Sequence, residues 1–423
     1  MNKTLIINGV LTSTGHLSRI VSGFVLLKVV SYYLGPEGLG FLGHFMTFMT
    51  VLALLSGGGI STSVVKYASE FKNDSIKING FIGAVFSYAL FFCALSFIVL
   101  IFFAKDISLF IFKTEDYYLF VYALAIVQVV IAFYNIVNGI VCGLGLLKIY
   151  AVIQVVGMLI FLPAVWFLVF NYKLIGAVIS VMFLYTSLVI PIIYFLIRER
   201  HGFNIYFDSV YIRRLFSFSF MLLVSAITFP VFEVIVREQI IQNHGYADAG
   251  IWQGSMRLSS AYMGFFGAFL AFYFMPIISS IADRKTVEAL VLRFVFFVFF
   301  VFVLGALILY FFKGFFIPLI LSDKFDALND LIIYQLLGDL FRVLSYVIGF
   351  VAVAKAATKT YVIAEVLQSV LLIVFIYYSS STLFNLEGVM HGYALAYAMY
   401  FILCAFSFVF YTRFSGRNNA VCS

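Results

Sequence analysis

The sequence predicts an all-α integral membrane protein with about twelve transmembrane helices in two pseudo-symmetric six-helix lobes. Three observations predict this fold class. Apolar residues make up 64% of the 423 residues and the mean hydropathy is +1.11, whereas soluble domains are about 45 to 50% apolar. Apolar windows of about 20 residues, the length that a helix needs to cross a hydrocarbon core of about 30 Å, recur along the whole chain. The second half of the chain also repeats features of the first.

Twelve apolar windows are predicted as spans, with cores at 5–34, 39–64, 80–103, 117–141, 151–170, 174–197, 216–241, 251–278, 294–312, 331–354, 361–378 and 389–411. Only 11% of the residues are charged, so no segment is polar enough for a separate soluble domain. The first window carries Arg19 and Lys28 and is followed by no small-residue cleavage site, which favours a first span over a removable signal peptide. Glycines 57, 58 and 59 are expected to let the second span bend, and the prolines inside the windows are expected to kink their helices.

Cations in the connections predict the orientation. With a cytoplasmic N-terminus, the inner connections and the tails hold most of the remaining basic residues, including a cluster formed by Arg198, Arg200, Arg213 and Arg214. The outer connections carry only Lys105, Lys113, Lys173, Lys313 and Lys324. This is a positive-inside bias, and it predicts that both termini are cytoplasmic. The net charge of +7 is therefore mainly a topology signal, and without a basic soluble surface no nucleic-acid partner is expected.

An internal repeat divides the chain. Gly35 and Gly40 of the turn GPEGLG recur as Gly245 and Gly250 of GYADAG, and further matches at nearly the same offset pair Lys113 with Lys324, Gln128 with Asp339 and Gln154 with Glu365. A duplicated six-helix unit explains such a run better than chance. It predicts an N-lobe at 1–210 and a C-lobe at 211–423, with the same orientation in the membrane and a substrate path between them.

Five cationic side chains lie inside the predicted spans and are the candidates for substrate binding: Arg19, Lys28, Arg237, Arg257 and Arg342. A cation at the centre of a spanning helix costs about 2.5 to 3.5 kcal/mol on insertion scales, so such residues usually face a bundle interior or a wet cavity. The chain is therefore expected to handle something anionic within the bilayer.

The second lobe offers carboxylates to two of these cations. Glu233 precedes Arg237 at the i,i+4 spacing that lets them pair on one helix face. Gln335, Asp339 and Arg342 form a polar stripe on one helix, and Gln128 and Asn135 occupy the corresponding helix of the first lobe. The candidates for a polar cavity wall or an ion-coupling site are Glu233, Asp339, Gln128, Asn135, Gln335 and Glu365. Glu233 or Asp339 would then either bind a coupling proton or Na⁺ or pair with the adjacent arginine.

The first lobe has no acidic residue in its spans, so Arg19 and Lys28 must reach water, the other lobe or an anionic ligand. The face of Arg19 carries Gly15, Ser22 and Gly23, which suits close approach of polar groups. Lys28 lies on the opposite side of an ideal helix, so it either reaches the same cavity through a bend, with its stem snorkelling, or anchors the outer interface. Histidines and cysteines are scattered, so no metal site, disulfide framework, cofactor or catalytic centre is expected.

Several strings of the sequence resemble a known family: the GPEGLG turn after a basic first helix, AGIWQGSMRLSSAY from Ala249, LSDKF from Leu321, YQLLGDLFRVLSYVIGFVAVAKA from Tyr334 and YVIAEVLQS from Tyr361. They resemble the bacterial O-antigen flippases of the Wzx type, and the second-half strings are similar to those of flippases for enterobacterial common antigen. The resemblance implies the polysaccharide-exporter branch of the multidrug, oligosaccharidyl-lipid and polysaccharide exporter superfamily.

What this resemblance implies is a multi-pass protein of the bacterial inner membrane that translocates an undecaprenyl-pyrophosphate-linked oligosaccharide from the cytoplasmic to the periplasmic leaflet by alternating access. It implies basic positions at Arg19, Lys28, Arg237 and Arg342, whereas Arg257 matches no position of the family. A polysaccharide polymerase and a chain-length regulator are expected partners, beside the lipid bilayer.

Two rival functions stay open. A small-molecule exporter of the same superfamily would predict a less cationic, more acidic and aromatic cavity. A membrane polymerase or ligase for the same lipid-linked sugars would predict a large periplasmic loop, and the longest outer connection, at 313–328, is short. An enzyme is therefore disfavoured.

Overall fold

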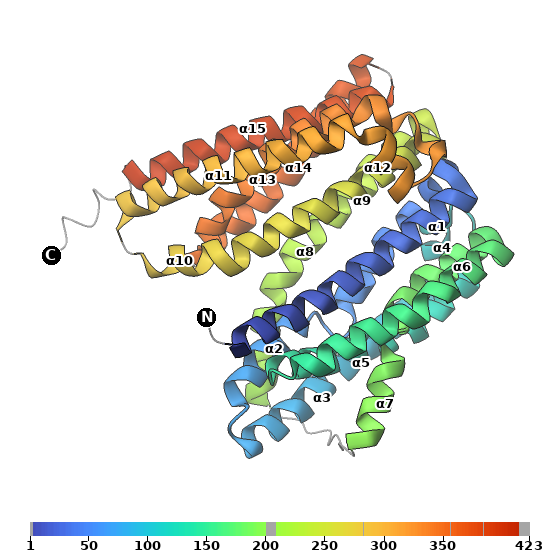
Figure 1. Cartoon of the computed structure of the whole chain (residues 1–423). Coiled ribbons are helices and arrows are strands. Elements are labelled where there is room, and N and C mark those ends of the chain that lie inside the picture. The colour runs from blue at the N-terminus through green and yellow to red at the C-terminus, as the bar shows by residue number, and fades with distance from the viewer. Residues whose placement is uncertain (1–2, 200–208, 282, 356, 384, 414–423) are drawn as a thin grey trace. The chain divides into compact units, whose positions relative to one another are not determined.

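The computed structural model describes residues 3–199, 209–281, 283–355, 357–383 and 385–413, and every regular element in these ranges is a helix (Figure 1). The chain divides into two compact units, which comprise Met1–Leu34 with Phe41–Pro230 and Gly35–Gly40 with Val231–Ser423. The lobe boundary predicted between residues 210 and 211 stays a prediction, and Arg200 of the predicted inner cluster lies outside the described residues.

The first unit begins with a long helix and ends inside another one. Its helices are α1 (Lys3–Leu55), α2 (Ser61–Phe71), α3 (Ser75–Phe102), α4 (Ala104–Phe112), α5 (Tyr118–Gly143), α6 (Leu147–Thr186), α7 (Val189–Glu199) and the first part of α8 (Ser209–His244). The second unit takes the rest of α8, then α9 (Tyr246–Phe269), a π-helical turn η1 (Leu270–Phe274), α10 (Met275–Ser280), α11 (Arg284–Phe311), α12 (Lys313–Ile320), a 3₁₀ turn η2 (Asp323–Phe325), α13 (Leu328–Ala354), α14 (Thr358–Leu383) and α15 (Leu386–Arg413).

Helices α1 and α6 each contain a chain reversal. Gly35 interrupts α1 with a φ of 67°, a conformation that glycine adopts without a steric penalty, and Pro36 then starts the next helical segment. Arg19 and Thr50 would be about 46 Å apart on a straight helix, yet both line one cavity. In α6 the break is at Lys173, and the rings of Phe161 and Phe183 on its two sides stack at 6.3 Å. Each of these helices therefore supplies two spans.

The helices account for the predicted number of spans. Eight helices in the described part of the chain are long and apolar enough to cross a membrane. Because α1 and α6 contribute two spans each, these eight provide ten, and α8 and α9 stand at the positions of the predicted seventh and eighth. On α11, Phe296, Phe300 and Leu304 form one apolar face and are 62%, 66% and 63% exposed, as expected of a surface that meets lipid.

The second predicted span is wrong in its extent. It was expected to continue with a bend to residue 64, but α1 ends at Leu55 and α2 begins at Ser61. Gly57, Gly58 and Gly59 all have φ near 70°, the left-handed region that a right-handed helix excludes. Three successive glycines thus end this span instead of bending it.

The repeat is visible in the fold. Asp74 caps the start of α3 and Asp283 caps the start of α11, and each carboxylate accepts a hydrogen bond from the backbone N–H three residues later. Gly35 and Gly245 share the same unusual backbone conformation, with φ values of 67° and 87°. The short helices α4 and α12, which the sequence does not predict, follow α3 and α11 at corresponding places.

The two GPEGLG-like turns meet in a reciprocal contact within the second unit. A Cβ at Gly250 would overlap the carbonyl oxygen of Pro36, and a Cβ at Gly40 would overlap the carbonyl oxygen of Tyr246. Pro36 and Tyr246 are repeat equivalents, as are Gly40 and Gly250. Only glycine at both places lets the two segments approach this closely.

Candidate functional site

A polar cavity of about 680 Å³ lies inside the first unit, between both segments of α1 and helices α2, α5 and α6. Its described lining comprises Arg19, Ser22, Gly23, Thr50, Ala53, Leu54, Val65, Tyr134, Asn135, Asn138, Gly139, Gln154, Gly157, Met158, Leu184, Tyr185, Ser187 and Leu188. The volume is in the range of small-molecule binding sites. We refer to it as the Arg19 cavity.

Arg19 is the one charged residue among the described residues that line this cavity. One turn earlier on α1, Gly15 lies so close to Tyr150 of α6 that a Cβ would overlap the phenol ring, so the two helices approach closely at this point. Ser18 and Ser22 donate their hydroxyl hydrogens to backbone carbonyls of α1. Within the described residues Arg19 has neither an ion pair nor a hydrogen bond from its side chain, and it is exposed. Its guanidinium is thus available to an anion.

Three residues with side-chain amides line the same cavity. Asn135 donates a hydrogen bond of 2.9 Å to the carbonyl of Ala53 and so ties α5 to α1. Gln154 is 2% exposed and donates a 2.7 Å hydrogen bond to the hydroxyl of Tyr134. The amide oxygens of Gln154 and Asn138 are buried and accept no hydrogen bond within the described part of the chain. Such groups normally find a partner.

Two predicted site residues of the first unit lie elsewhere. Lys28 is half-buried on α1 but is not one of the residues that line the Arg19 cavity, so the structure does not bring the two cations into one cavity. Gln128 is fully buried and donates a 2.8 Å hydrogen bond to the carbonyl of Cys93. Its amide joins α5 to α3 and does not face the cavity.

In the second unit, Asp339 is the centre of a buried polar network. Its carboxylate accepts hydrogen bonds from the hydroxyls of Tyr262 and Tyr393, the latter at 2.6 Å, and from the side-chain amide of Gln335 at 2.9 Å. Gln335 in turn accepts a 2.8 Å hydrogen bond from Ser255. The fully buried carboxylate is therefore surrounded by donors, as a buried charge requires.

The same network holds Arg342, as the polar stripe of the sequence predicts. Arg342 lies 3.8 Å from Asp339, donates to the hydroxyls of Tyr346 and Tyr393, and sits over the rings of Tyr346 and Tyr397. It is 6% exposed. This guanidinium is neutralised and hydrogen-bonded within its own unit. These contacts are sufficient to explain why a cation is buried here, without a bound substrate.

Arg237 is enclosed in a similar way. It forms the predicted ion pair with Glu233 at 3.8 Å, donates a 2.6 Å hydrogen bond to Gln253 and lies over the indole ring of Trp252. The side chain of Arg237 is completely buried. Arg257, one turn further along α9 than Gln253, is half-buried and near enough to Arg237 to interact with it electrostatically.

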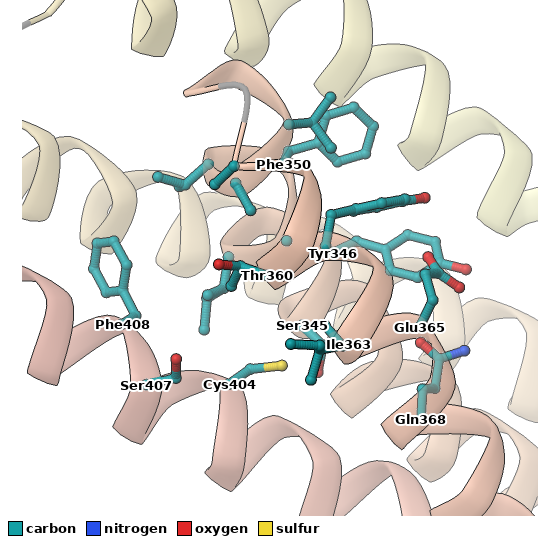
Figure 2. Close-up of a pocket in the computed structure, with 18 of the residues that line it drawn as sticks. Ser345, Tyr346, Phe350, Thr360, Ile363, Glu365, Gln368, Cys404, Ser407 and Phe408 are labelled. Carbon is teal, nitrogen blue, oxygen red and sulfur yellow. The ribbon is translucent and has the colours of Figure 1, made fainter. Parts of the chain in front are cut away.

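A second cavity, of about 780 Å³, lies inside the second unit between α13, α14 and α15. Figure 2 shows Tyr346, Glu365 and Gln368 at one side of it and Ser407 and Phe408 at the other. Its lining is mainly apolar, and Glu365 and Lys355 are its charged residues within the described chain. We refer to it as the Glu365 cavity. The described residues contain no cluster of three or more His, Cys, Asp or Glu side chains placed to hold a metal ion.

Sequence reasoning found Arg19 and Asn135 but missed Asn138, Tyr134 and Tyr185 as cavity residues, and it used Gln154 only as a repeat match. Asn135, Asn138 and Gly139 share one face of α5 at helical spacing, which is the one signal in the sequence for this wall. Tyr134 also lies on α5, whereas Gln154 and Tyr185 come from α6, and only the packing of the helices places them at the same cavity.

Comparisons with known proteins agree with this architecture. A family model described as "Polysaccharide biosynthesis protein" matches residues 29–330. Over 409 residues the chain is 30% identical to a protein named lipid III flippase from Escherichia coli (strain K12). The matched region covers 95% of this chain and 97% of the relative. The lipid III flippase of Shigella flexneri matches with the same identity and coverage.

Solved structures show the same fold at low sequence identity. An inward-facing multidrug resistance transporter of the MATE family, in the MOP superfamily, matches with a TM-score of 0.72 and 15% identity over 94% of this chain and 96% of its own. The lipid II flippase MurJ in an inward closed conformation matches with a TM-score of 0.70 and 17% identity over 95% of this chain and 87% of its own. The likeness to both structures concerns the fold, and it agrees with the predicted fold class.

Proposed function

Because the chain belongs to the polysaccharide biosynthesis protein family, as the match over residues 29–330 shows, we propose that it is a flippase for an undecaprenyl-pyrophosphate-linked oligosaccharide. It would move the O-antigen or a related repeat unit from the cytoplasmic to the periplasmic leaflet by alternating access. The curated relatives named lipid III flippase support a substrate of this class.

The observation that carries the proposal is the Arg19 cavity. It offers an arginine without an ion-pair partner among the described residues, and no carboxylate stands in its described lining. A pyrophosphate carries several anionic oxygens, and the planar guanidinium binds such oxygens through paired hydrogen bonds. The polyprenyl tail is apolar and can stay in the bilayer, so only the pyrophosphate and the sugars need a polar path.

The other cationic candidates are ranked by their contacts. Arg237 and Arg342 already have carboxylate partners and aromatic neighbours. We therefore assign them mainly to the stability of the fold and only secondarily to substrate binding. Lys28 and Arg257 are half-buried and do not line the Arg19 cavity, and we propose each as a further substrate-binding cation within its own unit.

A multidrug exporter is the weaker alternative. It would predict a less cationic, more acidic and aromatic cavity, and the Glu365 cavity has one carboxylate and several aromatic residues beside Lys355. The similarity to multidrug transporters rests on 15% identity and concerns the fold alone, whereas the relatives at 30% identity are named flippases.

Ion coupling is part of this proposal. Asp339 uses both carboxylate oxygens for hydrogen bonds from Tyr262, Tyr393 and Gln335, and Glu233 is paired with Arg237. Glu365 lines a cavity and is the better candidate to carry a coupling proton or to bind Na⁺.

We also propose a location in the bacterial inner membrane with both termini in the cytoplasm, and contact with a polysaccharide polymerase and a chain-length regulator.

A cellular experiment tests the function. In cells without this protein, the pyrophosphate-linked repeat unit should accumulate on the cytoplasmic leaflet, measured by extraction of the lipid-linked sugars and by their protection from an external probe. A cell that keeps exporting the repeat unit, with no accumulation inside, would contradict the proposal.

The role of Arg19 has its own test in reconstituted vesicles. Arg19→Ala should weaken binding of undecaprenyl pyrophosphate by about 10- to 100-fold, because a hydrogen bond to a charged group contributes about 1.5 to 3 kcal/mol. Lys105→Ala is a control that removes an exposed cation, paired with Glu115 at 3.8 Å, far along the sequence from the cavity. Equal binding by the Arg19→Ala protein would reduce this residue to a packing role.

A further inference from the structure

Two amides in the lining of the Arg19 cavity have oxygens that accept no hydrogen bond from the described residues, and they indicate a sugar-binding site. We propose that Gln154 and Asn138 bind the first sugar of the lipid-linked substrate, next to the pyrophosphate held by Arg19, through its hydroxyl or acetamido groups. This inference rests on the proposed flippase function and names the part of the substrate that this cavity recognises.

Both amides have an oxygen without a hydrogen-bond donor among the described residues. Gln154 is 2% exposed, lines the cavity, and uses one end of its amide on the Tyr134 hydroxyl at 2.7 Å. If the amide were turned round, Tyr134 would bond the other end, so one polar end of Gln154 is left without a partner among the described residues in either orientation. The buried amide oxygen of Asn138 also accepts no hydrogen bond within the described residues. Each such group needs a partner to offset its loss of hydration.

The missing partner of these amides must both donate and accept hydrogen bonds. An apolar polyprenyl chain offers no hydrogen bond, and a fully ionised phosphate offers acceptors only, which an amide oxygen repels. Sugar hydroxyls and acetamido groups both donate and accept, so they satisfy an amide in either orientation. The cavity thus combines one cation for a phosphate with neutral amides for a sugar, which matches the order of groups at the head of a pyrophosphate-linked saccharide.

The part of the cavity wall that carries these amides is tightly packed. Asn135 ties α5 to α1 through the Ala53 carbonyl at 2.9 Å, and Gly157 packs on Leu188 so that a Cβ would crowd the leucine side chain. Tyr134 is 7% exposed and fixes the Gln154 amide from the neighbouring helix. A site built on packed helices holds its polar groups in place, and binding sites that are pre-formed in this way discriminate well. A ligand that lacks the hydrogen-bonding group would leave the buried amides unpaired.

The test compares two ligands on one reconstituted protein: undecaprenyl pyrophosphate alone and undecaprenyl pyrophosphate that carries one N-acetylhexosamine. The wild-type protein should bind the sugar-bearing lipid more tightly. Gln154→Met should remove most of this preference, about a 10-fold effect for one unpaired buried group. Asn138→Ala, at a half-buried position, provides a second variant that changes the cavity wall with less disturbance of packing.

Gln128→Met is the matched control, because Gln128 is an equally buried amide of the same unit that lies outside the cavity. It should leave the ratio of the two affinities unchanged. Arg19→Ala should weaken both lipids alike. The inference is overturned if Gln154→Met and Asn138→Ala keep the wild-type ratio, or if wild-type protein binds both lipids equally. Failure of the wild-type protein to bind either lipid would instead overturn the proposed function.

Discussion

At the scale of single residues, Asp339 and Arg19 are charged groups in opposite surroundings. Asp339 is completely buried and is surrounded by donors, with Arg342 at 3.8 Å. Arg19 is exposed to a cavity and has no ion-pair partner in the described part of the chain. A buried ion pair adds little net stability, but loss of one partner leaves an uncompensated charge. Asp339 is therefore expected to matter for folding and Arg19 for binding.

Asp339→Leu should lower the thermal stability of the purified protein strongly, because it leaves the Arg342 guanidinium buried without its counter-ion, at a cost of about 3 to 5 kcal/mol. The double variant Asp339→Leu with Arg342→Met should recover part of the loss, since it removes the stranded charge as well. Thermal unfolding of the two single variants and the double variant in detergent measures the coupling. Glu115→Gln, which breaks an exposed pair, is the control and should shift the midpoint little. Additive losses in the Asp339 and Arg342 variants would contradict the paired state.

At the scale of elements, tight backbone contacts and capping residues fix where the helices start. Gly40 and Gly250 allow the segments that follow Gly35 and Gly245 to touch, and Asp74 and Asp283 start the long helices α3 and α11. The glycine pairs are predictable from the sequence because they recur with their spacing. The contact between them is not predictable, since spacing along a chain carries no information on which segments meet.

The glycine contact predicts a non-additive effect. Gly40→Ala and Gly250→Ala should each destabilise the protein by about 1 to 3 kcal/mol, because the new methyl group overlaps a carbonyl oxygen of the facing segment. The double variant should cost less than the sum, since segments that one methyl group has forced apart have room for the second. Gly305→Ala, in open space on α11, is the control. Thermal midpoints of the four proteins measure the effect, and strict additivity would exclude a shared contact.

The capping aspartates predict a pH dependence. Hydrogen bonds from the backbone N–H and the ammonium of Lys77 lower the pKa of Asp74, and those from the hydroxyl and backbone N–H of Thr286 lower the pKa of Asp283. A carboxylate with a lowered pKa in the folded state stabilises that state above its unfolded pKa, about 3.9, and this stabilisation is lost as the pH falls through the folded pKa.

Asn caps a helix about as well as Asp but does not titrate in this range. The double variant Asp74→Asn with Asp283→Asn should therefore lose less stability between pH 6 and pH 3 than the wild-type protein. The difference is the stabilisation that the wild-type protein loses when its two capping carboxylates become protonated. Thermal unfolding at a series of pH values tests this. Parallel curves for the two proteins would show that the caps do not depend on ionisation.

At the scale of the whole molecule, the hydropathy pattern and the internal repeat are sufficient to predict the fold class from the sequence. Apolar windows locate the helices because each helix must hide its backbone from lipid, and the duplication accounts for the corresponding caps at Asp74 and Asp283. The short helices α4 and α12 escaped prediction because they are continuous in hydropathy with the spans before them. Arg19 could be predicted because a lone cation stands out in an apolar helix. Asn138 and Gln154 could not, because a single amide on a helix is common and only the packed structure shows that it lacks a partner.

The reciprocal contact of Gly40 with Tyr246 and of Gly250 with Pro36 has the form of an isologous interface, in which two copies present the same surface to each other. In a homodimer every substitution appears twice. In one continuous chain the two copies diverge independently, and here Gln128 and Gln154 of the first copy stand where the second has Asp339 and Glu365. The duplication therefore allows one copy to keep a cationic cavity without acidic neighbours while the other gains carboxylates, a division of charge that two identical subunits could not have.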